Sequence, residues 1–324
     1  MSSEQNRQKR KLIIAGKIIF GLALLILLFA KVDFRDFIAT FGEAKVEYCL
    51  LGFVVFGLMG IAESLRLLVT LKTFAVSFST AVFLYLTGTF FANFMPGNVG
   101  SEVYKVYFLN RIKPGFNKPI ALMFLLRVSG LGVLLLMLMA YLPFNYARLM
   151  EVMVGEIQFK GNAGTSSLVI ASVIFFTVVI VLLVLTIKRQ QLFKKIRSQF
   201  LRFFEALFSL SVKQYMGIIS LSVVVHGLRM LFFYCLIRAF AETFSFHDLI
   251  PLTALVVFAS LLPISFASLG VREGAIVGGL MLFGIPPEIA LSVAALARCP
   301  LLLISLLGGG VFIARRNKAE LVPE

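Results

Sequence analysis

The sequence Pro96-Gly97-Asn98-Val99-Gly100-Ser101-Glu102 interrupts a long apolar stretch, and Arg127 follows Glu102 after 25 residues. A related sequence, Ser268-Leu269-Gly270-Val271-Arg272-Glu273, interrupts a second apolar stretch about 170 residues later, and Arg298 follows Glu273 after another 25 residues. Glycine turns, carboxylates and arginines are unfavourable in contact with lipid. Because interrupted helices in corresponding positions of two halves mark the binding sites of transporters, the matched spacing indicates a duplicated membrane unit with a polar centre.

The composition is that of a membrane protein. Hydrophobic residues make up 60% of the 324 residues, and the mean hydropathy is +0.97. Several apolar runs reach the roughly 20 residues that a helix needs to cross a bilayer. We therefore expect an all-α polytopic integral membrane protein.

The apolar runs predict about eight transmembrane helices, at residues 12–30, 48–71, 78–95, 117–142, 167–187, 214–237, 248–266 and 287–314. Two shorter helices, 101–112 and 271–283, follow the glycine-containing interruptions. They are predicted to be the returning half-helices of two re-entrant hairpins, because irregular backbone at membrane depth must be buried in protein or line a cavity.

The net charge of +15 is interpreted as an excess of basic residues that sets the orientation of the chain in the membrane. We therefore expect no nucleic-acid partner. With the N-terminus inside, the predicted inner segments carry about three times as many Lys and Arg residues as the outer ones. Both termini are then cytoplasmic. Each half contains three net crossings and one hairpin, so the second half is predicted to be an inverted-topology repeat of the first.

The repeat predicts the domain organisation: a basic N-terminus 1–11, a first membrane repeat 12–142, a linker 143–166, a second membrane repeat 167–314 and a tail 315–324. The first apolar run follows basic residues but no cleavage site follows it, so it is interpreted as an uncleaved span. The basic, amphipathic segment 192–210 fits either a helix on the inner membrane surface or an ordinary cytoplasmic connection.

Five arginines lie inside predicted membrane segments: Arg66, Arg127, Arg229, Arg272 and Arg298. Only Glu63, Glu102 and Glu273 are carboxylates at similar depth. A charge near the bilayer centre costs at least about 2.5–3.5 kcal/mol, so such residues face an interior and have partners. The surplus of positive charge predicts an anionic ligand, and a phosphate-bearing lipid headgroup is the natural candidate.

The duplication includes a second set of positions, in which Glu63 and Arg66 correspond to His226 and Arg229. Residues three apart meet on one helix face. An unperturbed histidine titrates near neutral pH, so His226 and Glu63 are candidates for proton coupling. The alternative is a histidine that packs or donates a hydrogen bond.

Asn98 and Lys105 extend the polar lining of the first hairpin, although Lys105 also fits a charge that only sets the topology. For the two Glu…Arg sets, ion pairs that lock helices together are a further interpretation, compatible with ligand binding. The sequence contains no HExxH, paired aspartates, Cys/His cluster or Walker A motif, so we expect no enzymatic activity, no metal and no cofactor.

The stretch from Asn93 to Glu102 resembles the first signature of the flippase-like transmembrane family, which includes the membrane domain of lysylphosphatidylglycerol synthases, also called multiple peptide resistance factors. The second signature is similar to Ser268–Glu273, followed by Phe283-Gly284-Ile285-Pro286 and Ala297-Arg298. The resemblance covers about residues 12–315. The family's first signature is usually richer in glycine, with Asp common near the position of Glu102, so Asn98 and Glu102 depart from it.

The resemblance implies an inner (plasma) membrane protein that binds and translocates an anionic phospholipid or a lipid-linked glycan. Since the chain ends at Glu324, we expect a stand-alone member without the soluble synthase domain. The alternatives are an accessory or scaffold subunit of a lipid- or glycan-modifying complex and, third, a membrane-embedded lipid transferase. The protein partner that we expect is either a second copy of this chain, in a homo-oligomer, or a lipid-modifying enzyme.

Overall fold

The computed structural model describes residues 39–93, 99–159, 205, 208–240, 243–262 and 268–316. Every regular element in these ranges is a helix, which confirms the all-α prediction for them. The predicted spans at 12–30 and 167–187 lie outside the described residues. So do the terminal segments 1–11 and 317–324 and nearly all of the amphipathic segment 192–210.

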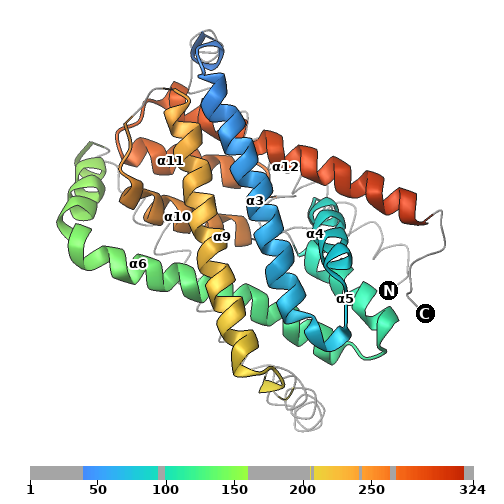
Figure 1. The fold of residues 1–324 in the computed structure, drawn as a ribbon. Helices are drawn as coiled ribbons and strands as arrows, with labels where there is room; N and C mark the ends of the chain where they lie inside the picture. Colours follow the sequence, from blue (N-terminus) through green and yellow to red (C-terminus); the bar gives the residue numbers. More distant parts are fainter. Residues whose placement is uncertain are drawn as a thin grey trace, which may run out of the picture.

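The helices follow the same order in both halves: long, short, short, long (Figure 1). The first half contains α3 (Val46–Thr70), the 3₁₀ turn η1 (Lys72–Phe74), α4 (Phe78–Ala92), α5 (Gly100–Ile112) and α6 (Asn117–Phe159). The second half contains α9 (Val212–Arg238), the 3₁₀ turn η3 (Phe246–Asp248), α10 (Leu249–Leu261), α11 (Val271–Leu282) and α12 (Pro287–Arg316).

Four helices are long and apolar enough to cross a membrane: Val46–Thr70, Asn117–Asn145, Val212–Arg238 and Pro287–Arg315. Two shorter apolar helices, Phe78–Ala92 and Phe246–Leu261, form the first arms of the two predicted hairpins. All six coincide with predicted spans. The chain is therefore a membrane protein, as its composition indicated.

Prolines explain where some helices end. Leu262 is extended, with ψ 124°, and ends α10 five residues before the predicted boundary at 266. The next residue is Pro263, whose ring disfavours helical backbone in the residue before it. Lys113 ends α5 in the same way, extended with ψ 109° before Pro114.

The helix that begins at Asn117 does not end at residue 142, as predicted. It includes Pro143 and continues to Phe159, so the first part of the predicted linker 143–166 is helical. Proline removes one intrahelical hydrogen bond and bends a helix without always ending it. Figure 1 shows the C-terminal part of α6 running in a new direction.

The centre of the molecule is an antiparallel pair, α3 and α9, which run side by side in Figure 1. Ala239 O, just after α9, accepts a hydrogen bond from Lys45 N, just before α3, at 2.7 Å. At the other end, Gln214 Nε2 in α9 donates to Val69 O in α3 at 3.3 Å. Each helix therefore begins where the other ends.

The hairpin of each half packs against the last long helix of the other half, α4 against α12 and α10 against α6. Glycines permit the closest approach. A Cβ atom at Gly308 in α12 would collide with Leu86 O in α4, and one at Gly309 would lie 2.8 Å from the ring of Phe90. Small residues at helix contacts let backbones approach closely in membrane proteins.

Candidate functional site

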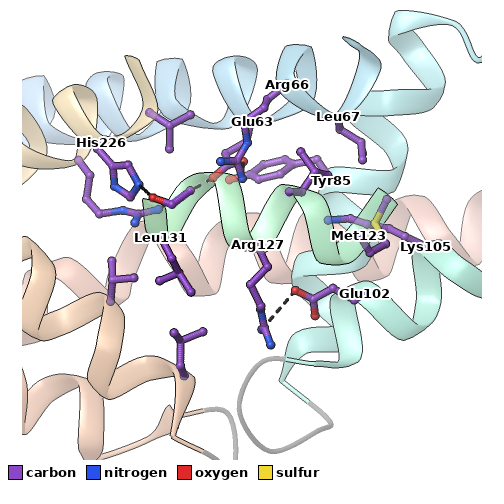
Figure 2. Close-up of a pocket in the computed structure, with 16 residues that line it drawn as sticks. Glu63, Arg66, Leu67, Tyr85, Glu102, Lys105, Met123, Arg127, Leu131 and His226 are labelled. Carbon is purple, nitrogen blue, oxygen red and sulfur yellow. Dashed lines mark hydrogen bonds and ion pairs between the residues drawn. The ribbon is translucent and has the colours of Figure 1, made fainter. Parts of the chain in front are cut away.

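A cavity of about 230 Å³ lies where the central helices meet α4, α5, α6 and α10 (Figure 2). Its charged or titratable lining residues are Glu63, Arg66, Glu102, Lys105, Arg127, His226 and Arg229. Its other lining residues are Leu67, Tyr85, Met123, Leu126, Gly130, Leu131, Val225, Val257 and Leu261. The lining thus combines four cationic side chains with two carboxylates, so positive charge exceeds negative charge by two.

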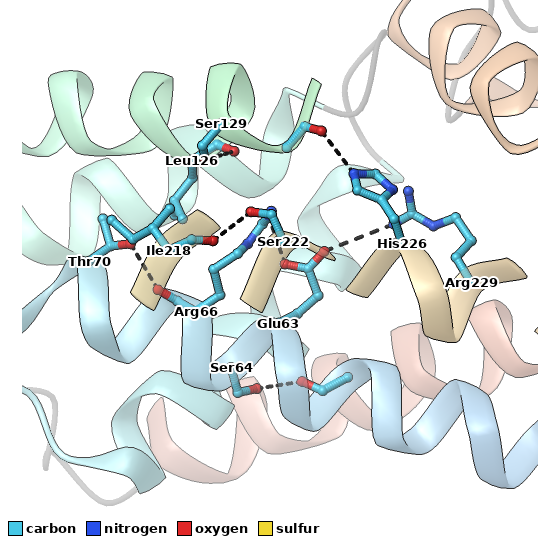
Figure 3. Close-up of polar contacts among 12 residues, drawn as sticks. Glu63, Ser64, Arg66, Thr70, Leu126, Ser129, Ile218, Ser222, His226 and Arg229 are labelled. Atoms are coloured by element: carbon cyan, nitrogen blue, oxygen red, sulfur yellow. Dashed lines mark hydrogen bonds and ion pairs between the residues drawn. The ribbon is translucent and has the colours of Figure 1, made fainter. Parts of the chain in front are cut away.

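Glu63 shares its carboxylate between arginines of the two halves. Its Oε2 lies 2.8 Å from Arg66 Nη2, one turn along α3, and its Oε1 lies 3.9 Å from Arg229 Nη2 in α9. Arg66 Nη1 also donates to Ser222 Oγ in α9 at 3.1 Å (Figure 3). A single carboxylate cannot neutralise both guanidinium groups, so this cluster retains positive charge.

His226 is buried, and its Nε2 lies 2.9 Å from Gly130 O in α6. Since a carbonyl oxygen only accepts, Nε2 carries the hydrogen in this contact. The hydrogen bond joins α9 to α6 beside the arginine cluster. This geometry favours the hydrogen-bonding interpretation of His226, and proton coupling through His226 and Glu63 stays a prediction.

Both predicted Glu…Arg sets form ion pairs. Glu102 Oε1 in α5 lies 3.2 Å from Arg127 Nη2 in α6, and Glu273 Oε1 in α11 lies 2.8 Å from Arg298 Nη2 in α12. In each half, the returning arm of the hairpin is thereby joined to the long helix that follows it. The matched spacing of 25 residues reflects this shared geometry.

The two ion pairs differ in their surroundings. The Glu102 and Arg127 side chains are 29% and 31% exposed and line the cavity. The Glu273 and Arg298 side chains are only 9% and 12% exposed. Glu273 Oε2 also accepts a hydrogen bond at 2.7 Å from the N–H of Gly270, which has a φ of 77° that favours glycine.

The second pair is therefore part of the packed interior, together with Arg272. The Arg272 guanidinium interacts electrostatically with Arg298, Glu273 and Arg229. Glu273 attracts this guanidinium while Arg298 and Arg229 repel it, so Arg272 adds positive charge between the second-half ion pair and the central cluster without lining the cavity.

The cavity includes seven of the predicted residues, which are Glu63, Arg66, Glu102, Lys105, Arg127, His226 and Arg229. Arg272, Glu273 and Arg298 lie in the adjoining cluster, and Asn98 lies outside the described residues. Lys105, which the sequence alone could not separate from a topological charge, faces the cavity and interacts electrostatically with Glu102 and Glu63.

Two polar cavity neighbours did not emerge from the sequence. Tyr85 lies in the apolar helix α4, where a single tyrosine is equally common as a packing residue. Ser222 lies in α9 and belongs to neither of the sequence patterns that recur in the two halves. Among the residues that the structure describes, no group of three or more His, Cys, Asp or Glu side chains is placed to hold a metal ion.

The family model described as "Lysylphosphatidylglycerol synthase TM region" matches residues 13–309, which include both hairpins and every residue of the cavity. No curated protein matches the chain. The family match confirms the resemblance inferred from the two signatures, and the chain belongs to the lysylphosphatidylglycerol synthase transmembrane family.

Proposed function

We propose that this protein is a flippase-like lipid transporter that binds the headgroup of an anionic phospholipid or a lipid-linked anionic headgroup in the central cavity and moves it across the membrane. The observation that carries the proposal is the cationic surplus of the cavity, four cationic side chains against two carboxylates. Buried charges require partners, and a phosphate would supply the missing negative charge.

The chemistry of the lining suits a phosphate. Arginine offers a planar set of donors that matches phosphate oxygens, and lysine adds a compact charge. Arg127 in α6 and Lys105 in α5 both line the cavity, and each interacts with Glu102. Membership of a lipid-related membrane family agrees with a lipid as the source of the phosphate.

The arrangement of the helices supports movement between two sides. We propose that the protein lies in the inner (plasma) membrane and consists of an inverted repeat of about eight spans. Both of its termini are then cytoplasmic. Lys113, in the turn after α5, donates to Thr73 O near the end of α3, whereas Phe283, after α11, packs on Phe244 near the end of α9. Because α3 and α9 are antiparallel, the turns that follow the two hairpins lie at opposite ends of the central pair, as alternating access would require.

Reconstitution into liposomes tests the proposal. We expect the purified protein to accelerate translocation of fluorescent phosphatidylglycerol, measured by dithionite bleaching, more than that of phosphatidylcholine with the same chains. The Arg127→Gln variant is expected to lose at least about 10-fold in rate for the anionic lipid, which corresponds to about 1.4 kcal/mol.

Arg111→Gln is the matched control, because Arg111 is exposed in the last turn of α5, outside the cavity. It should transport like the unmodified protein. If the protein translocates neither fluorescent lipid, transport of such lipids by this chain alone is wrong, and an accessory role in a lipid-modifying complex becomes the better interpretation.

A further inference from the structure

A second, apolar depression adjoins the cavity between α5 and α6. It has a volume of about 470 Å³. Its lining residues are Val99, Glu102, Val103, Val106, Tyr107, Phe116, Ile120, Met123, Phe124 and Arg127. Val103, Ile120 and Phe124 are 45%, 45% and 50% exposed. We call this feature the α5–α6 groove.

The groove and the cavity share Glu102, Met123 and Arg127. The Glu102–Arg127 ion pair therefore lies at the boundary between a cationic cavity and an apolar surface. In Figure 2 this pair is set apart from the Glu63–Arg66 cluster, on the other side of the α6 ribbon. A charged site continuous with an apolar groove matches the two parts of a phospholipid.

We infer that the α5–α6 groove holds an acyl chain of an anionic phospholipid whose phosphate binds Arg127 in place of Glu102. The inference rests on the proposed function, since it takes the cavity as the headgroup site. It adds the path of the acyl chain and identifies the ion pair that the lipid opens.

The geometry of Glu102 suits such an exchange. Its pairing distance of 3.2 Å is longer than the 2.8 Å in the second half, and its Oε2 makes no hydrogen bond with any described residue. After the exchange, Glu102 would still interact electrostatically with Lys105, which is one turn along α5. The carboxylate would not be left as an unpaired buried charge, which would cost several kcal/mol.

The second-half pair lacks these properties. Glu273 is held by both Arg298 and the Gly270 N–H, and both of its partners are within the packed interior. The structure therefore has a lipid path on the α5–α6 side. We expect the acyl chain to enter there and not between α11 and α12.

The chain contains no tryptophan, so a single introduced tryptophan reports contact with a brominated lipid by fluorescence quenching. The reporter is Ile120→Trp in the detergent-solubilised protein. The probes are phosphatidylglycerol and phosphatidylcholine with identical dibrominated chains. We expect the phosphatidylglycerol to quench at about 10-fold lower concentration, because only its net charge complements the cavity.

Leu306→Trp is the matched control, since Leu306 is 71% exposed in α12 and lies outside the groove. Both lipids should quench it equally. In the Ile120→Trp protein, adding Arg127→Gln should abolish the preference, and adding Glu102→Gln should preserve or increase it. Val103→Trp, on the α5 side of the groove, replaces the first reporter if Ile120→Trp does not fold.

Equal quenching by the two lipids at positions 120 and 103, or a preference that survives Arg127→Gln, would overturn the inference. The experiment measures binding without transport. A preference for phosphatidylglycerol without translocation in liposomes would support acyl-chain binding in the α5–α6 groove and contradict the proposed transport. Translocation without the preference would support transport and contradict binding in the groove.

Discussion

At the scale of single residues, burial separates two ion pairs that occupy equivalent positions. Arg298 and Glu273 are nearly excluded from solvent, whereas Arg127 and Glu102 are about a third exposed. Removing one member of a buried pair leaves an uncompensated charge, but an exposed pair contributes little. The same sequence spacing therefore gives one pair that stabilises the fold and one that a ligand can open.

This difference predicts the effects of two matched substitutions on stability. Glu273→Gln should lower the free energy of unfolding by about 3–5 kcal/mol, because Arg298 then stays buried without a charge partner. Glu102→Gln should change it by less than about 1 kcal/mol. Thermal unfolding of both variants in the same detergent measures the two losses of stability. Equal losses would show that the two ion pairs stabilise the fold equally and would contradict the prediction.

The hydrogen bond between His226 and Gly130 O is expected to contribute to stability. His226→Ala should destabilise the protein by about 1 kcal/mol or more, because Gly130 O loses its donor and a space is left beside it. His226→Gln retains a donor and should recover part of the loss. If translocation by His226→Gln loses a pH dependence that the unmodified protein has, proton coupling through His226 gains support over the hydrogen-bonding interpretation.

At the scale of helices, the contact between α4 and α12 joins the two halves. Gly308 has Leu86 O directly over the place of a Cβ atom, while Gly310, two residues further along, has no atom within 4 Å of that place. The close approach therefore depends on Gly308 and Gly309 and not on Gly310. The neighbouring Gly309 faces the ring of Phe90.

Alanine at the two positions should thus have opposite effects. Gly308→Ala should destabilise the protein by about 1–3 kcal/mol, because α4 and α12 must move apart. Gly310→Ala should be neutral or stabilise the helix by up to about 1 kcal/mol, since alanine is the better helix former. Thermal unfolding compares them, and a loss at Gly310 equal to that at Gly308 would contradict the proposed contact.

At the scale of the whole molecule, the antiparallel central pair places the turn after α5 and the turn after α11 at opposite ends, near the ends of α3 and of α9. In an inverted repeat these turns face opposite sides of the membrane. Pro114 and Pro286 are exposed in the two turns and serve as labelling positions.

In a protein whose own cysteines, Cys49, Cys235 and Cys299, have been replaced, Pro114→Cys should react with a membrane-impermeant maleimide only from the cytoplasmic side. Pro286→Cys should react only from the other side. The test uses right-side-out and inside-out vesicles. Labelling of both positions from the same side would disprove the inverted arrangement.

Much of this protein follows from the sequence by itself. The length of the apolar runs determines the long helices, because a helix is the local structure that satisfies its own backbone in lipid. The equal spacing in Glu102…Arg127 and Glu273…Arg298 was sufficient to predict two equivalent sets, since each hairpin returns to the helix that follows it. The excess of arginine over carboxylate predicted a cationic centre.

Only the tertiary structure decided how those charges are shared. Glu63 contacts arginines from both halves because α9 packs alongside α3, and no local pattern encodes that packing. The unequal burial of the two ion pairs, and the groove beside one of them, depend on how tightly each hairpin packs against its neighbours. Packing distances arise from side chains far apart in the sequence, so equal spacing could not reveal that only the Glu102–Arg127 pair borders both the cavity and the groove.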